Sequence, residues 1–205
     1  MTYSDFTLES VTRAFHLQLR RAMLFPQAAA VDVPSWLTDA LARGRPFALG
    51  SEKARSELIV VPVLLASIER SHDTRSLYSG QRLDVAPDRG LTGECDFILT
   101  NSPALPILQN PIVMLVEAKK NDIEAGLGQC TAQMIGARLF NEREGSDISI
   151  ISGCVTTGES WQFLKLVDDT VLIDSERYYL VNLGLLLAVF DAIAGCYQSS
   201  TELSL

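Results

Sequence analysis

The sequence predicts an α/β protein in which a mixed β-sheet carries helices on its faces. Apolar residues recur at helical spacing near both ends of the chain and once in its middle. Two groups of short segments with strand character separate these helices. The order helices, three strands, helix, three strands, helix is typical of a mixed sheet covered by helices. The length of 205 residues suits a single domain overall.

Five segments have the apolar spacing of helices, and the third of them carries two local signals. Ser51 is a good N-cap for the third helix, and Pro62 is expected to kink that helix because proline lacks the N–H group. We expect residues 1–50 to form an N-terminal helical extension packed on a core formed by residues 51–205. The predicted helices are Leu8–Leu19, Trp36–Ala42, Ser51–Ser71, Ile123–Glu142 and Val181–Tyr197.

Six segments are predicted to be strands, and residues typical of turns separate them. Pro87–Gly90, with the sequence P-D-R-G, is a turn signal, and Asn101–Asn110 is a longer loop with two prolines. The predicted strands are Gln81–Ala86, Glu94–Thr100, Ile112–Lys119, Ile148–Thr156, Trp161–Val167 and Val171–Tyr179.

Composition and charge place the chain among soluble globular proteins. Hydrophobic residues make up 47% of the chain and charged residues 20%. The net charge of −8 weighs against a dedicated nucleic-acid binder. It is compatible with a nuclease, because some of the negative charge would belong to metal-binding carboxylates and a local basic face can coexist with an acidic total.

Cysteine spacing and the absence of targeting signals predict a cytoplasmic protein. The four cysteines show no C-x-x-C spacing, so we expect reduced thiols and no structural zinc. The N-terminus lacks the pattern of a signal peptide. The longest apolar run, Leu180–Gly195, contains Asn182 and Asp191, and we expect it to be a buried helix rather than a membrane span.

The most informative segment is I-V-M-L-V-E-A-K at Ile112–Lys119, an apolar strand that ends in two charged residues. Strand side chains alternate between faces, so Glu117 and Lys119 point to one face and Ala118 to the other. Asp96 begins the preceding strand, 21 residues before Glu117, and it approaches Glu117 if the two strands are neighbours. The two carboxylates and the carbonyl of Ala118 are hard oxygen ligands that suit Mg²⁺ or Mn²⁺.

Four further polar residues are candidates for the same site. Lys119 would position a water molecule or neutralise a phosphate. Glu57 lies on the preceding helix, immediately before a very apolar segment. Gln129 and Gln133 are four residues apart and therefore share one face of the helix that follows Lys119.

The pattern D-x(20)-E-A-K, with an upstream acidic residue and Q-x-x-x-Q downstream, resembles the PD-(D/E)xK nuclease superfamily. More narrowly, it is similar to the nuclease domain of type I restriction endonuclease subunits and related small stand-alone proteins. The resemblance covers roughly residues 50–180 and implies a restriction-endonuclease-like fold. Two departures are Cys95, at the position of the name-giving proline, and Gln133, where a tyrosine often occurs.

The resemblance also implies roles for individual residues. Asp96 and Glu117 would be metal ligands and Lys119 the catalytic lysine. Glu57 would be an accessory acidic residue, reaching the metal through water, and Gln129 matches the glutamine of the family. Glu94, two residues before Asp96, is an alternative ligand.

These features together predict a Mg²⁺-dependent nuclease that hydrolyses phosphodiester bonds, with DNA as the expected partner and no membrane association. Sequence specificity would come from a homodimer, a partner chain or a loop such as Asn101–Asn110. One alternative is a module that keeps the fold for interactions but has lost catalysis. Another is an enzyme that acts on a small-molecule phosphate ester. The sequence contains neither a G-x-S-x-G elbow nor a P-loop motif, so it gives no support to a serine hydrolase or an ATP-driven motor.

Overall fold

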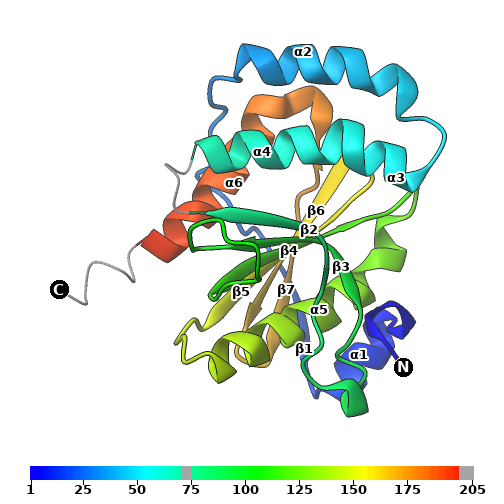
Figure 1. Cartoon of the computed structure of the whole chain (residues 1–205), viewed down its shortest axis with the longest axis vertical. Coiled ribbons are helices and arrows are strands. Elements are labelled where there is room, and N and C mark those ends of the chain that lie inside the picture. Colours follow the sequence, from blue (N-terminus) through cyan, green and yellow to red (C-terminus); the bar gives the residue numbers. More distant parts are fainter. Residues whose placement is uncertain (71–74, 199–205) are drawn as a thin grey trace.

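The computed structural model describes residues 1–70 and 75–198. It confirms the predicted mixed α/β class: eight strands form one sheet with helices on both faces (Figure 1). The strands are β1 (Gln18–Ala22), β2 (Ser76–Arg82), β3 (Glu94–Thr100), β4 (Ile112–Ala118), β5 (Ile150–Thr156), β6 (Ser160–Val167), β7 (Thr170–Asp174) and β8 (Tyr178–Tyr179).

The sheet has the strand order β1-β7-β6-β5-β4-β3-β2, with β8 paired to β6. The pairs β1–β7 and β4–β5 are parallel, and the other pairs are antiparallel. All seven residues of β4 are buried. A strand that is buried on both faces needs apolar side chains on both, which explains the unbroken apolar run before its last two residues.

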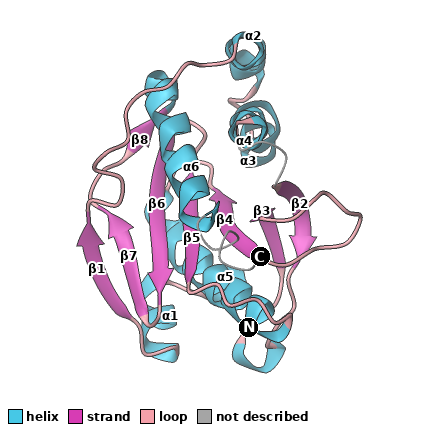
Figure 2. Ribbon diagram, turned by 90° about the vertical axis from the view of Figure 1, so that its left-hand side faces the viewer, coloured by secondary structure: helices cyan, strands magenta, loops and turns pink. Residues whose placement is uncertain are grey.

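The helices form layers above and below the sheet (Figures 1 and 2). One face carries α4 and α6, with α2 outside them, and the other carries α5, against which α1 packs. A π-helical segment, Ser56–Val60, joins α3 to α4. The helices are α1 (Leu8–Ala14), α2 (Ser35–Gly44), α3 (Glu52–Arg55), α4 (Val61–Glu69), α5 (Ile123–Arg143) and α6 (Leu183–Gln198).

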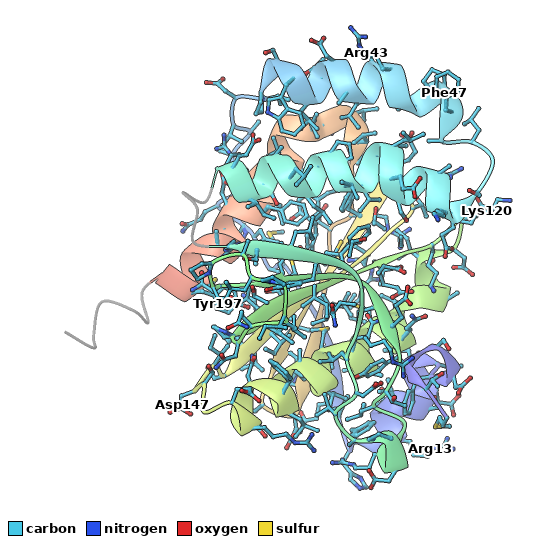
Figure 3. The ribbon with its side chains drawn as sticks, viewed as in Figure 1. Arg13, Arg43, Phe47, Lys120, Asp147 and Tyr197 are labelled. Carbon is cyan, nitrogen blue, oxygen red and sulfur yellow. The ribbon has the colours of Figure 1, made fainter. Side chains whose placement is uncertain are left out.

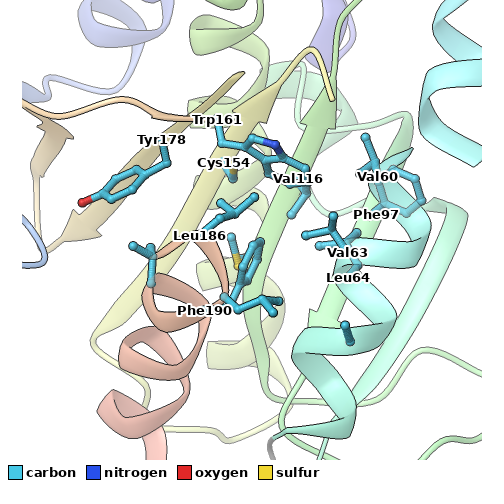
Figure 4. Close-up of a cluster of buried hydrophobic side chains, with 14 of the residues drawn as sticks. Val60, Val63, Leu64, Phe97, Val116, Cys154, Trp161, Tyr178, Leu186 and Phe190 are labelled. Atoms are coloured by element: carbon cyan, nitrogen blue, oxygen red, sulfur yellow. The ribbon is translucent and has the colours of Figure 1, made fainter. Parts of the chain in front are cut away.

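Each face of the sheet has its own hydrophobic core. On the α4 and α6 side, Trp161 and Phe163 of β6 meet Phe190 of α6 edge to face, with ring centroids 5.9 and 5.5 Å apart. Figure 4 shows Trp161 and Phe190 within this cluster. On the other side, apolar residues of α5 and of the N-terminal segment cover β3, β4 and β5. Trp161 and Phe163 are therefore fully buried core residues rather than exposed platforms for bases.

A buried asparagine of α5 fixes the start of β4. The side chain of Asn141 accepts a hydrogen bond from the backbone N–H of Ile112 and donates one to its carbonyl, both at 2.7 Å. The side-chain amide thus satisfies the backbone of Ile112 as a neighbouring strand would. This contact holds α5 at a defined position along the strand that carries Glu117 and Lys119.

The predicted helix Leu8–Leu19 is wrong beyond Ala14. Helix α1 ends there because His16 takes a left-handed conformation, with φ of 55°, which a continuing right-handed helix excludes. The chain then forms β1, which pairs with β7 at the edge of the sheet. Four of its five residues are exposed, so the alternation of buried and exposed residues that identifies a strand is missing.

Two predicted strands are displaced or divided. The strand β2 is Ser76–Arg82 rather than Gln81–Ala86, although Ala86 does form an isolated bridge with Leu91. The predicted strand Val171–Tyr179 is divided into β7 and β8. The carboxylate of Asp174 accepts a hydrogen bond from the backbone N–H of Glu176 at 3.1 Å, and this contact turns the chain. The predicted helix Ser51–Ser71 is described from Glu52 to Glu69, and Ser71 lies outside the described residues.

The C-terminal apolar segment packs on the sheet as helix α6, as predicted. Its window Leu180–Tyr197 is long and apolar enough to cross a membrane by length and composition alone, and half of it is buried inside the protein. A soluble core helix has the same properties. The four cysteines are free, and only Cys196 is exposed.

Candidate functional site

The candidate site lies where the ladder between β3 and β4 ends. The last pair of this antiparallel ladder is Phe97 with Val116, so the next position brings Asp96 level with Glu117. The ladder does not continue there, because Asp96 Oδ2 accepts the backbone N–H of Ala118 at 2.8 Å. The prediction that these two strands are neighbours is therefore confirmed. The backbone of β4 itself holds the carboxylate of Asp96.

Glu117 is the buried centre of a hydrogen-bond network with α5. Its side chain is 2% exposed. Lys119 Nζ donates to Glu117 Oε1 at 2.7 Å and to Gln129 Oε1 at 3.0 Å. Gln133 Nε2 donates to Glu117 Oε2 at 2.8 Å. The expectation that Glu117 and Lys119 share a face is met, and both glutamines of the Q-x-x-x-Q motif point to them.

Gly126 has no side chain, which allows the first turn of α5 to pack closely against Lys119. A Cβ atom at Gly126 would lie 2.5 Å from Val155 Cγ1 and 3.1 Å from Lys119 Cγ. Both distances are shorter than ordinary van der Waals contact. The first turn of α5 can therefore rest on β5 and on the stem of Lys119 only because position 126 has no side chain.

Burial and charge repulsion raise the pKa of both carboxyl groups. The pKa of Glu117 rises to about 7, first because the group is desolvated and then because Asp96 is close, while Lys119 and Gln133 oppose the rise. Burial also raises the pKa of Asp96, against the effects of the Ala118 amide and Lys119. Burial lowers the pKa of Lys119, but the adjacent carboxylate of Glu117 outweighs it, so the pKa lies above its ordinary value and the ammonium is retained.

A cavity of about 430 Å³ adjoins Asp96 on the side of α3 and α4. Four carboxylate side chains line it: Glu52, Glu57, Glu94 and Asp96. Glu57 is more than half exposed, and its closest charged partner is Lys53 Nζ at 3.8 Å. The structure thus places Glu57 and Glu94 beside Asp96 in one cavity, and among the described residues neither forms a hydrogen bond or ion pair with Glu117 or Lys119.

Glu52 is a site residue that the sequence reasoning missed. Its charge acts to raise the pKa of both Asp96 and Lys119, so it lies within electrostatic range of the centre of the site. On a regular α-helix, residues 52 and 57 would point about 140° apart. Both side chains nevertheless line the cavity, together with Lys53 and Ser56 of the same helical face. The only local signal was the position of Glu52 next to the N-cap Ser51.

The donor atoms at this site are of the kind that Mg²⁺ uses. Among the described residues, no group of three or more His, Cys, Asp or Glu side chains is close enough to hold a metal ion. Mg²⁺ does not need such a cage, because it is held in proteins by one or two carboxylates and keeps several waters. The carboxylates of Asp96 and Glu117 and the carbonyl of Ala118 match that donor set.

Cys95 adds no thiolate ligand to this donor set in the metal-free protein. Cys95, beside Asp96, is fully buried, and desolvation raises the pKa of its thiol far above the ordinary value. The thiol therefore stays protonated, whereas zinc is bound by the thiolate form.

Comparison with protein-family models and with curated proteins finds no match to this chain.

Proposed function

We propose that this chain is a divalent-cation-dependent nuclease that hydrolyses phosphodiester bonds in DNA. The observation that carries the proposal is the buried arrangement of Glu117, Lys119 and Gln129 beside Asp96 at the end of the β3–β4 ladder. A buried strand end gains no stability from two repelling carboxylates, because their desolvation is costly. The choice of DNA as the polymer rests on the resemblance to restriction-endonuclease subunits.

In this proposal Asp96, Glu117 and the Ala118 carbonyl hold Mg²⁺ or Mn²⁺, with Glu52 and Glu57 in support. A cation bound there lowers the pKa of water and stabilises negative charge that develops on a phosphate. The backbone N–H of Ala118 fixes the orientation of Asp96. Gln133 fixes the orientation of Glu117 in the same way from α5.

Lys119 has a separate role. Its ammonium is partly exposed and lies between Glu117 and Gln129, so the head group has little freedom to move. We assign it to the orientation of the attacking water and to the neutralisation of the scissile phosphate. Gln129 positions the lysine. It would act on the reacting groups only through Lys119, without contacting them itself.

Measurements of metal binding and of DNA cleavage together test this proposal. Calorimetric titration with MgCl₂ should show binding that Asp96→Asn and Glu117→Gln abolish. Lys119→Met should lower cleavage of plasmid or linear DNA by at least about 100-fold, because a charged group in contact with the phosphate is removed. Glu144→Gln is the matched control, since Glu144 is exposed at the end of α5 and lies outside the site.

One observation favours the alternative of an inactive interaction module. Both oxygens of Glu117 already accept hydrogen bonds from side chains of the protein, at 2.7 and 2.8 Å. A closed network of this kind would serve as a stable core element without a cation. Absence of Mg²⁺ and Mn²⁺ binding, together with intact single-stranded DNA, duplex DNA and RNA after incubation, would overturn the nuclease proposal and favour this alternative.

The same assay separates a third possibility, an enzyme for small phosphate esters. Turnover of bis(p-nitrophenyl) phosphate without cleavage of any polymer would support that enzyme and reject the nuclease.

A further inference from the structure

A second cavity, of about 480 Å³, lies on the sheet face that α6 covers. Its walls come from the segment Leu24–Val31, from β6 and from the C-terminal half of α6. Its volume falls within the usual range for small-molecule sites, and most of its lining is apolar. None of the residues of the candidate nuclease site lines it.

The two sites are well separated in the molecule. Lys165, in the cavity, pairs through Ser152 of β5 with Met114, which lies four residues before Ala118 on β4. Figure 3 shows the same separation: Lys120, which follows Lys119, and Tyr197, which follows Cys196 of the cavity, lie on opposite sides of the view.

Lys165 is the unusual residue of this cavity. It continues the row of Trp161 and Phe163, two core residues on the same face of β6. An apolar side chain would be expected there. The ammonium of Lys165 instead lies 5.9 Å from the centroid of the Phe25 ring. Within the described part of the chain, it forms neither a hydrogen bond nor an ion pair.

The one carboxylate that lines the cavity does not neutralise Lys165. Asp191 is held by the guanidinium of Arg70, with nitrogen–oxygen distances of 2.6, 3.0 and 3.1 Å. Its charge is therefore balanced by that arginine. A partly buried ammonium among apolar walls is left without a counter-ion, an arrangement that is unfavourable unless an anion completes it.

We propose that this cavity binds a small anionic amphiphile, with a carboxylate head at Lys165 and an apolar body against Phe25, Ala188 and Ala192. The apolar body gains free energy by leaving water. The carboxylate forms an ion pair in surroundings that are drier than the protein surface, where such pairs are stronger. This inference does not depend on the proposed nuclease activity.

Octanoate and octan-1-ol are matched probes, because they share a chain length and differ in charge. Calorimetry on the full chain should show octanoate binding at least about tenfold more tightly than the alcohol, which corresponds to about 1.4 kcal/mol. Lys165→Met should remove this difference and leave the affinity for octan-1-ol unchanged. Arg143→Met, which removes a cation from an exposed position at the end of α5, should change neither affinity.

Cys196 reports occupancy of the cavity directly, because it lines the cavity and is the exposed one of the four thiols. Octanoate should slow alkylation of Cys196 by iodoacetamide in the native chain but not in Lys165→Met. Ala192→Phe, at an exposed position on α6, should fill the cavity and prevent binding of both probes. Equal affinities for octanoate and octan-1-ol, unchanged binding in Lys165→Met, or no protection of Cys196 would each overturn the proposal.

Discussion

At the scale of single residues, Glu117 makes the stability of the metal-free protein depend on pH. Its pKa is about 7 in the folded state, above the ordinary value of 4.5, so the folded state binds the proton more tightly than the unfolded state does. The contribution of Glu117 to the free energy of unfolding is therefore largest below about pH 4.5, and it decreases as the pH rises to 7. The raised pKa of Asp96 acts in the same direction. Urea denaturation in EDTA should show a loss on the order of 3 kcal/mol over that range.

The variant Glu117→Gln isolates this effect. The amide keeps the size of the side chain and removes the titration, so the pH dependence between 4.5 and 7 should become much flatter. Glu144→Gln, at an exposed position, should keep the slope of the native chain. A slope in Glu117→Gln equal to that of the native chain would show that another group causes the effect.

The local sequence around each residue determines which site residues could be predicted. Glu117 and Lys119 follow from local alternation along one strand, and Gln129 and Gln133 from the spacing of one helix. Both patterns depend on neighbours in sequence. Glu52 does not, because it reaches the site only through the cavity that α3 forms with residues of β2 and β3, which are distant in sequence.

At the scale of elements, the contact between α5 and the strands depends on one missing side chain. Gly126→Ala places a Cβ atom 2.5 Å from Val155 Cγ1, so α5 must move away from β5 and Lys119. Alanine favours the helix by up to about 1 kcal/mol, but overpacking costs about 1–3 kcal/mol. We expect a net loss in the free energy of unfolding, measured by urea denaturation, and a lower cleavage rate than in the native chain.

Gly195→Ala is the comparison for that variant. Gly195 lies in α6, and a Cβ atom there meets nothing within 4 Å. The helical preference of alanine then acts alone and should stabilise the protein by up to about 1 kcal/mol. Stabilisation by Gly126→Ala to a similar extent would mean that α5 does not rest on Lys119 as described.

Elements buried at the centre of the molecule were predictable, and the edges of the sheet were not. The central strand β4 and the long helix α5 agree with their predicted bounds within one residue. Strand β1 was missed because it lies exposed at the edge of the sheet and pairs with a strand about 150 residues further along the chain. A local pattern carries no information about such a partner.

At the scale of the whole molecule, the N-terminal segment and the C-terminal half of the chain stabilise each other. Strand β1 completes the edge beside β7, and the backbone N–H of Leu24 donates to the buried carboxylate of Asp174 at 3.3 Å. Tyr3, Phe6 and Val11 belong to the core that α5 covers. Since one sheet separates and supports both cores, we expect a single cooperative unfolding transition that reports on the candidate site and on the remote cavity alike.

That coupling makes thermal unfolding a measure of cation binding at the site. A ligand that binds only the folded state stabilises it, by about 1.4 kcal/mol at ten times its dissociation constant. For a chain of this size, the melting temperature should rise by about 3–6 °C in MgCl₂, and EDTA should reverse the rise. Asp96→Asn and Glu117→Gln should abolish the shift, because each removes a carboxylate ligand, and Glu144→Gln should keep it. An equal shift in all four proteins would identify a general salt effect and contradict specific binding at Asp96 and Glu117.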